Sequence, residues 1–167
     1  AWTLGSTMSD LGTSAYLVGL LDGAISPAFL ASVVFVVSAA TAFATGTSFG
    51  TMGIMVPMVI PLSFAISSDP VVHMAASGAV LSGACWGDHC SPISDTTVLS
   101  SLGAGCNHVE HVRTQLPYAI ACGAISLLAG NLPVGLGAPL WLALLLGSAA
   151  CILVVRFIGR VPVTSPE

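Results

Sequence analysis

Long apolar tracts separated by short polar clusters run through most of the chain. One tract extends over residues 28–44 and a second over 52–66, with "TGTSFGT" between them. A single helix over 28–66 would be about 58 Å long, nearly twice the hydrocarbon core of a bilayer, so the chain must turn. Each arm is shorter than the roughly 20 residues of a full span. We therefore predict a re-entrant helical hairpin over 28–66, broken at Gly46 and Gly50, with paired short spans as the alternative.

The next tract is a helical pattern that stops at a polar run and then resumes. Residues 71–86 are apolar and rich in small side chains, "GDHCSPISDTT" follows, and the chain continues as "VLSSLGAG". Pro92 lacks a backbone donor and Gly87 loosens the preceding turn, which predicts a discontinuous helix over 71–105. Irregular backbone at membrane depth is tolerated only where it lines a polar cavity. An ordinary aqueous loop over 87–97 is the alternative.

Two more apolar tracts lie toward the C-terminus. They cover residues 116–131 and 138–157, after the polar segment "CNHVEHVRTQ", and predict a transmembrane helix pair over 116–157. Residues 1–27 are too broken for a span. We interpret them as the end of an upstream helix, a linker and a short helix.

The composition places these tracts in lipid. Of the 167 residues, 55% are hydrophobic and 6% are charged, whereas about 25% of a soluble domain is charged. The chain has no Lys and no basic patch, which argues against nucleic acid as a partner. Its five Cys are scattered in apolar sequence and do not form a secreted disulfide framework. We expect an all-α polytopic protein of the cell membrane, with the lipid bilayer as its surroundings.

Three Arg residues predict the orientation of the last helix pair. Arg113 precedes the pair, and Arg156 and Arg160 follow it. Two crossings return the chain to its starting side, so all three lie on one face. The positive-inside rule makes that face, and with it the C-terminus, cytoplasmic.

The polar run between the halves of the discontinuous helix contains candidate ligands for an ion. Asp88 and Asp95 would each cost roughly 2.5–3.5 kcal/mol at a helix centre, so an intramembrane acid is a functional hypothesis by default. Ser91, Ser94 and Thr96 add hydroxyl groups. Carboxylates, hydroxyls and free carbonyls are the ligands of a hard monovalent cation, and they also suit a proton site. We predict Na⁺ binding at the two acids.

The two acids stand on opposite sides of the break. Ser94 and Asp95 lie where the second half-helix begins, and a helix N-terminus favours the carboxylate form. Asp88 lies at the C-terminal end of the first half, where partial negative charge disfavours ionisation. We infer that Asp88 is the better proton carrier and Asp95 the more permanent cation ligand.

The predicted hairpin tip has a similar chemistry. Thr45, Thr47, Ser48 and Thr51 surround two Gly that let backbone approach a ligand closely. Ser and Thr in membrane helices often only bond back to their own helix. Together with a second broken, hydroxyl-rich element, however, they match the way secondary transporters build ion sites near the midplane.

Other site chemistries fit less well. A zinc site would draw on residues whose spacing is C-x4-C rather than the usual tight pairs: Cys85, Cys90, Cys106, His89, His108 and His111. His108, Glu110 and His111 are expected to face cytoplasmic water. An intramembrane aspartyl protease needs Gly-x-Gly-Asp, but residues 85–88 are Cys-Trp-Gly-Asp. A Ser-His-Asp triad from Ser91, His89 and Asp88 is sterically poor because the three are so close in sequence. We therefore expect a protein that is not an enzyme.

Two stretches, "ATGTSFGTMGIMVPMVIPL" and "SGACWGDHCSPISDTTVLSSLGAGCNHVEHVRTQLPYA", resemble the C-terminal half of Na⁺/H⁺ antiporters of the NhaC type in the ion-transporter superfamily; "AWTLGSTMSDLGTSAYLVGLL" is also similar. The resemblance implies two inverted repeats, each with a re-entrant hairpin and a broken helix, and an elevator-like movement of the hairpin domain. It marks residues 45–51 as the hairpin tip and Asp88, Ser91, Ser94, Asp95 and Thr96 as the broken-helix loop.

We therefore expect a secondary active transporter that exchanges Na⁺ for H⁺ and needs no cofactor. The chain contains one repeat, so we expect a fragment or a truncated C-terminal domain whose partner is a missing N-terminal repeat, with a homodimer as another possible assembly. The same-class alternative is a proton- or Na⁺-coupled exchanger of organic acids or amino acids, since relatives in the superfamily include such carriers. The alternative of another class is a metal-binding structural membrane subunit.

Overall fold

The structure, a computed structural model, describes residues 3, 6–7, 10–21 and 26–158. Parts of the predicted segment 1–27, and Arg160, lie outside the described residues. Within them the secondary structure is helical, without strands, as predicted. The helices are α2 (Thr13–Leu21), α3 (Pro27–Thr45), α4 (Ser48–Ile66), α5 (Pro70–Cys90), α6 (Asp95–Gly103), α7 (His108–Ile125), the π-helix η1 (Ser126–Asn131), α8 (Leu132–Gly135) and α9 (Leu140–Ile158).

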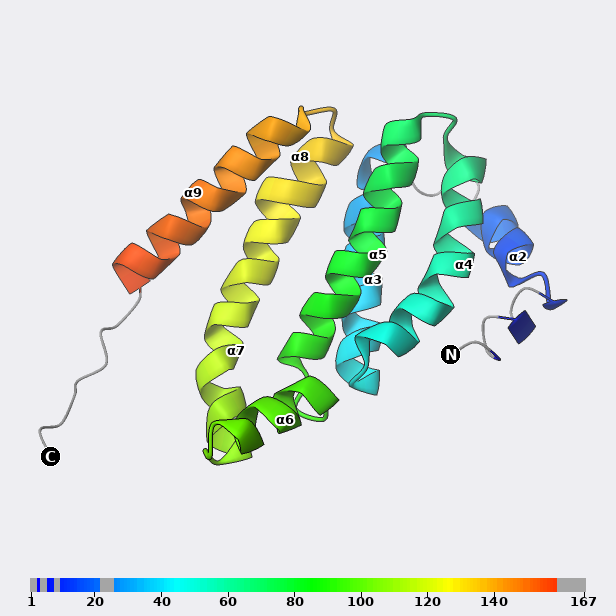
Figure 1. The fold of residues 1–167 in the computed structure, drawn as a ribbon. Coiled ribbons are helices and arrows are strands. Elements are labelled where there is room, and N and C mark those ends of the chain that lie inside the picture. Colours follow the sequence, from blue (N-terminus) through cyan, green and yellow to red (C-terminus); the bar gives the residue numbers. More distant parts are fainter. Residues whose placement is uncertain (1–2, 4–5, 8–9, 22–25, 159–167) are drawn as a thin grey trace, which may run out of the picture.

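Four helical segments of the described chain are long and apolar enough to cross a membrane. They are α3, α4, the continuous helix His108–Gly135, and Leu140–Phe157 of α9. Several such helices in one chain agree with the predicted multi-pass membrane protein. In Figure 1, α9, the helix from α7 to α8, α5 and α4 stand side by side from left to right, and α3 lies behind α5.

The most extensive helix packing joins α3 to α5 and depends on small residues. Gly83 and Gly87 are four residues apart and therefore lie on one face of α5. A Cβ on Gly83 would overlap the Phe35 carbonyl, and a Cβ on Gly87 would overlap the Ala39 carbonyl. This is the small-xxx-small arrangement by which membrane helices bring their backbones together. It fixes the first half of the discontinuous helix against the first arm of the hairpin.

The hairpin turn is tighter than the sequence suggested. Gly46 ends α3 with a left-handed φ of 69°, and the Thr47 side chain accepts a hydrogen bond from Gly50 N at the start of α4. Because Thr47 caps the helix, α4 begins at Ser48, and Gly50 lies in its first turn rather than in a loop. Each arm has 19 residues, so the length argument for a re-entrant hairpin is weaker than the sequence indicated. The re-entrant arrangement stays a prediction.

The helix break lies between Cys90 and Asp95. Gly87 does not loosen the helix as expected, because α5 stays helical to Cys90. The chain then passes through a short non-helical segment around Pro92, and Ser94 caps α6. In Figure 1, α6 lies across the end of the bundle between α5 and α7 instead of continuing the line of α5. The second half-helix is therefore turned sharply relative to the first.

The last two spans form an antiparallel pair. The helix that begins at His108 continues through η1 and α8 to Gly135, and in η1 the bond from Leu132 N to Leu127 O closes a π turn. Pro133 follows at once, and its ring would clash with a regular α-helical carbonyl, which gives the π turn a physical cause. α9 then returns toward the end of the bundle where α7 begins (Figure 1).

Candidate functional site

The hairpin tip packs directly on the helix break. Ser91 Oγ donates a hydrogen bond of 2.8 Å to the Phe43 carbonyl, 48 residues earlier in the chain. At Gly46, an added Cβ would lie 2.9 Å from the Ile93 carbonyl oxygen. The two polar elements singled out in the sequence therefore meet at one end of the α3–α5 pair.

Asp88 is the buried acid of this region. It lies in the last turn of α5 with only 6% of its surface exposed. One oxygen, Oδ2, accepts a hydrogen bond of 3.4 Å from Thr96 Oγ1, which lies 2.8 Å from Ser94 Oγ. The other oxygen, Oδ1, is buried and has no hydrogen-bond partner among the described residues. A buried carboxylate oxygen left in this way needs a partner, and a donated hydrogen bond or a bound cation would supply it.

Asp95 has a different environment. It is the first residue of α6, directly after the cap residue Ser94, whose hydroxyl accepts a hydrogen bond from Thr96 N at 3.3 Å. Its side chain is exposed and makes no hydrogen bond with the part of the chain that the structure describes. In the structure Asp88 lies at the end of α5 and Asp95 at the start of α6, and only Asp88 is buried.

The hairpin hydroxyls form a second cluster. Thr45 Oγ1 donates to Thr41 O at 2.8 Å and lies 3.4 Å from Thr51 Oγ1, which itself donates to Thr47 O at 2.9 Å. Thr51 is 1% exposed, whereas Ser48 is half-buried. Because the two Thr protons point to backbone carbonyls, the hydroxyl oxygens keep lone pairs. Within the described residues no hydrogen bond joins this cluster to Asp88; the tip and the break touch through Ser91 and Gly46.

Two residues of α7, His108 and Gln115, also contact the break, and neither contact was predicted from the sequence. His108 Nε2 lies 2.7 Å from Pro92 O, and Gln115 Nε2 donates to His89 O. His108 was expected to face water. Its side chain is half-buried, and its Nε2 atom faces the Pro92 carbonyl of the break. The two residues are seven positions apart, which is two helical turns and one face. Their spacing was the signal in the sequence that both side chains face the same neighbour.

The zinc alternative gains no support from the geometry. Among the described residues, no group of three or more His, Cys, Asp or Glu side chains could hold a metal ion. Cys85 and Cys106 are exposed, and both ring nitrogens of His108 lie within hydrogen-bond distance of other groups, the Pro92 carbonyl and the Ser101 hydroxyl.

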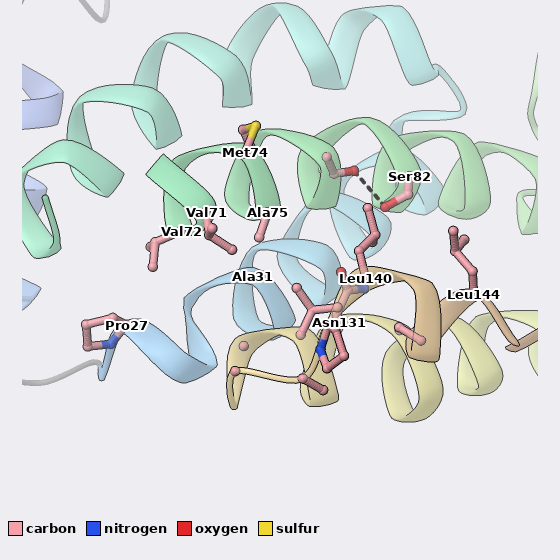
Figure 2. Close-up of a pocket in the computed structure, with 18 of the residues that line it drawn as sticks. Pro27, Ala31, Val71, Val72, Met74, Ala75, Ser82, Asn131, Leu140 and Leu144 are labelled. Atoms are coloured by element: carbon pink, nitrogen blue, oxygen red, sulfur yellow. Dashed lines mark hydrogen bonds between the residues drawn. The ribbon is translucent and has the colours of Figure 1, made fainter. Parts of the chain in front are cut away.

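A cavity of about 900 Å³ lies away from the break. Figure 2 shows Pro27 and Val71, at the start of α3 and α5, on its wall together with Asn131 and Leu140. More than half of its lining residues belong to the segment 126–144, which contains η1, α8 and the start of α9, and most of the others come from the N-terminal halves of α3 and α5. Asp88, in contrast, lies at the C-terminal end of α5. It is therefore separate from the candidate ion site.

Comparison with known proteins places the chain among transporters. The model of the Na⁺/H⁺ antiporter family matches residues 1–130. An uncharacterised protein of Haemophilus influenzae is 51% identical over 119 residues, 71% of this chain and 22% of that protein. The Na⁺/H⁺ antiporter NhaC of Alkalihalophilus pseudofirmus is 35% identical over 92 residues, 55% of this chain and 19% of that one. The malate-2H⁺/Na⁺-lactate antiporter of Bacillus subtilis is 34% identical over 103 residues, 61% and 21% of the two chains.

No solved structure gives a significant match. The chain spans about a fifth of the length of these curated relatives. The region matched by the family model includes both the hairpin and the break where Asp88 lies, and the family is one of transporters rather than enzymes. On this match, the chain belongs to the Na⁺/H⁺ antiporter family.

Proposed function

We propose that this chain forms the cation and proton site of a secondary active transporter that exchanges Na⁺ for H⁺. The observation that carries the proposal is Asp88, a buried carboxylate with one oxygen held by Thr96 and the other free. A charge without a partner is costly in this environment, whereas a bound proton or a bound cation neutralises it. One site with two mutually exclusive occupants is what an antiporter requires.

The hydroxyls around Asp88 supply the remaining ligands. When its carboxylate is deprotonated, Asp88 binds Na⁺. The hydroxyl oxygens of Thr96 and Ser94 then replace part of the hydration shell of the ion. With the carboxylate protonated, the ion leaves, because the negative charge that held it is gone. Asp95, at the start of α6, supplies a second carboxylate that attracts the cation whether or not Asp88 carries a proton. Ser91 and the tip residues complete the site: Thr45, Thr47, Ser48 and Thr51.

Transport also requires a second repeat. We infer a re-entrant hairpin and a broken helix related to a second such pair by inverted symmetry, supplied by further sequence or by a second copy of the chain. Discontinuous helices from two repeats meet near the bilayer midplane in secondary transporters, and the hairpin domain moves as an elevator in this proposal. Residues 1–167 alone are expected to give no Na⁺/H⁺ exchange, and exchange by a monomer of them would contradict this part of the proposal.

The side of the membrane follows from Arg113 and Arg156. They lie near the start of α7 and the end of α9, which are antiparallel, and the positive-inside rule makes this side cytoplasmic. Single Cys residues introduced near Asn107 and Pro162 in a Cys-free variant are expected to react with a membrane-impermeant thiol reagent only from the cytoplasmic side. Labelling of the two positions from opposite sides of the membrane would contradict a pair of transmembrane helices between them.

Dequenching of a pH-sensitive dye in proteoliposomes tests the function. Vesicles with the full-length gene product and an imposed proton gradient are expected to lose that gradient on addition of Na⁺ or Li⁺, but not of choline. A response only to malate, lactate or an amino acid would favour the organic-acid exchanger, the candidate that the name of the Bacillus subtilis relative supports. Stoichiometric zinc binding without transport would favour the structural subunit.

A further inference from the structure

The break in the discontinuous helix leaves carbonyl groups without helical partners. The last four carbonyls of an α-helix have no intrahelical donor, and Pro92 offers no N–H to the segment that follows α5. The Asp88 carbonyl accepts a hydrogen bond of 3.0 Å from Ser91 N. The carbonyls of His89 and Pro92 need donors from elsewhere, because an unsatisfied backbone group is costly at membrane depth.

Both donors come from one face of α7. Gln115 Nε2 donates to His89 O, and His108 Nε2 lies 2.7 Å from Pro92 O, a carbonyl that can only accept. Trp86 Nε1 adds a third bond between these helices, 2.6 Å from the Ala119 carbonyl. The first half-helix is thus attached to α7 along its last turn and beyond.

The imidazole of His108 also reaches the second half-helix. Its Nδ1 lies 3.2 Å from Ser101 Oγ in α6, and Ser101 Oγ also lies 2.8 Å from the Val98 carbonyl, to which it can donate. Ser101 is 1% exposed, so this contact is inside the structure. One ring therefore holds the break segment and α6 in a fixed relation to α7.

The carbonyls held by α7 lie next to the ligands of the candidate ion site. Pro92 is the neighbour of Ser91, which donates to the hairpin arm at Phe43. It is two residues from Ser94, whose hydroxyl lies 2.8 Å from the Thr96 hydroxyl that bonds Asp88. A shift of the Pro92 carbonyl would move these hydroxyls relative to the acid.

We propose that His108 and Gln115 are positioning residues for the ion site. They act from α7 on the His89 and Pro92 carbonyls, and through them they set the distances among Ser94, Thr96 and Asp88. Neither residue touches the ion. This inference rests on the proposed function, since it assigns the residues to the geometry of the same site.

Substitutions at His108 separate the two bonds of the ring. In His108→Gln the amide nitrogen can take the place of Nε2 and reach Pro92 O; in His108→Asn the shorter amide can replace only Nδ1. We expect His108→Asn to raise the Na⁺ concentration for half-maximal exchange on the order of tenfold with little change in the maximal rate, and His108→Gln to stay near wild type. Gln115→Met, which keeps the length and removes the donor, is expected to behave like His108→Asn.

The matched control is His111→Ala, because the His111 side chain makes no hydrogen bond with described residues while it lies one turn along α7. The variants are measured as the full-length gene product in proteoliposomes, by Na⁺ titration at fixed pH. Equal losses of maximal rate in His108→Gln and His108→Asn, with unchanged half-saturation, would overturn the proposal, because they would indicate a merely structural role.

Hydrogen–deuterium exchange of the peptide covering residues 89–96 gives a readout that does not depend on transport. We expect faster exchange in His108→Asn and Gln115→Met than in His108→Gln and His111→Ala. Absence of Na⁺-dependent proton transport in wild-type vesicles would contradict the proposed function. The deuterium uptake of residues 89–96 would still decide whether α7 fixes the break. Equal exchange in all four variants would overturn the positioning role itself.

Discussion

The hydroxyl of Thr96 lies 3.4 Å from Oδ2 of Asp88 and so connects the first turn of α6 to the last turn of α5 across the break. Only one carboxylate oxygen is engaged in this way, and the other is free and buried. The acid of one half-helix therefore meets a hydroxyl of the other, and any change in the relation between α5 and α6 changes this contact.

The first prediction removes this contact. Thr96→Val keeps the shape of the side chain and loses the hydroxyl, so a Na⁺ ion at Asp88 would lose one oxygen ligand. We expect the Na⁺ concentration for half-maximal exchange to rise about three- to tenfold, the effect of one hydrogen bond or ligand. Thr96→Ser, which retains the oxygen, is the matched control. A Na⁺ titration with equal curves for both variants would argue against a ligand at Thr96.

The second prediction concerns the charge of Asp88. Asp88→Asn has nearly the same size but cannot carry a proton, so Na⁺-dependent proton movement is expected to fall to the level of empty vesicles. The protein is expected to be as thermally stable as wild type or more so, because burial of the charged form is costly. Asp69→Asn is the control: it replaces an acid that caps the opposite end of α5, where Asn caps equally well. A wild-type rate in Asp88→Asn would exclude Asp88 as the proton carrier.

The third prediction separates Asp95 from Asp88. Asp95→Asn retains a residue compatible with the start of α6 but removes the charge, so folding is expected to survive and Na⁺ binding to be lost. In the wild type, protons compete with Na⁺ for the carboxylates, so the half-saturating Na⁺ concentration is expected to rise as pH falls. Na⁺ titrations at several pH values measure both effects. If this variant and Asp88→Asn both kept wild-type rates and pH profiles, the polar run would be an ordinary loop.

The sequence was sufficient to locate the break but not to position its surroundings. Pro92 and the cap residue Ser94 are local signals, and the structure ends α5 and begins α6 on either side of them. The direction of α6 after the break has no local signal. It depends on contacts with α7 such as the one between His108 and Ser101, which only the folded chain brings together.

The start of α4 was misjudged although its signal is local. The Thr- and Gly-rich run was interpreted as a loop, but the Thr47 hydroxyl caps a helix, and α4 begins four residues earlier than expected. His108 and Gln115 both belong to the polar segment "CNHVEHVRTQ", in which His108 was expected to face water. Their bonds to Pro92 and His89 join residues 16 and 26 positions apart, which composition and periodicity do not reveal.

The fourth prediction tests the close packing of α3 on α5. A Cβ at Gly87 would overlap the Ala39 carbonyl, whereas at Gly78 of the same helix it would meet nothing within 4 Å. Gly87→Ala is expected to lower the free energy of unfolding by about 1–3 kcal/mol, the usual cost of overpacking. Gly78→Ala is expected to be neutral or to stabilise α5 by up to about 1 kcal/mol. Thermal unfolding in detergent measures the difference, and equal midpoints would show that the two helices can separate freely.

The fifth prediction tests whether the hairpin tip must touch the break. Gly46 and Gly105 both have a left-handed backbone, with φ of 69° and 62°, but only at Gly46 does a Cβ meet a neighbour, 2.9 Å from the Ile93 carbonyl oxygen. Ala at either position costs about 1–2 kcal/mol of backbone strain. Any loss of transport activity in Gly46→Ala beyond that in Gly105→Ala therefore reports the contact between the hairpin tip and the break. We expect Gly46→Ala to reduce Na⁺-dependent exchange in proteoliposomes far more than Gly105→Ala, because Ile93 lies between the candidate ligands Ser91 and Ser94 and has to move. Similar losses in both variants would show that strain alone explains the effect, and that the two polar elements work independently.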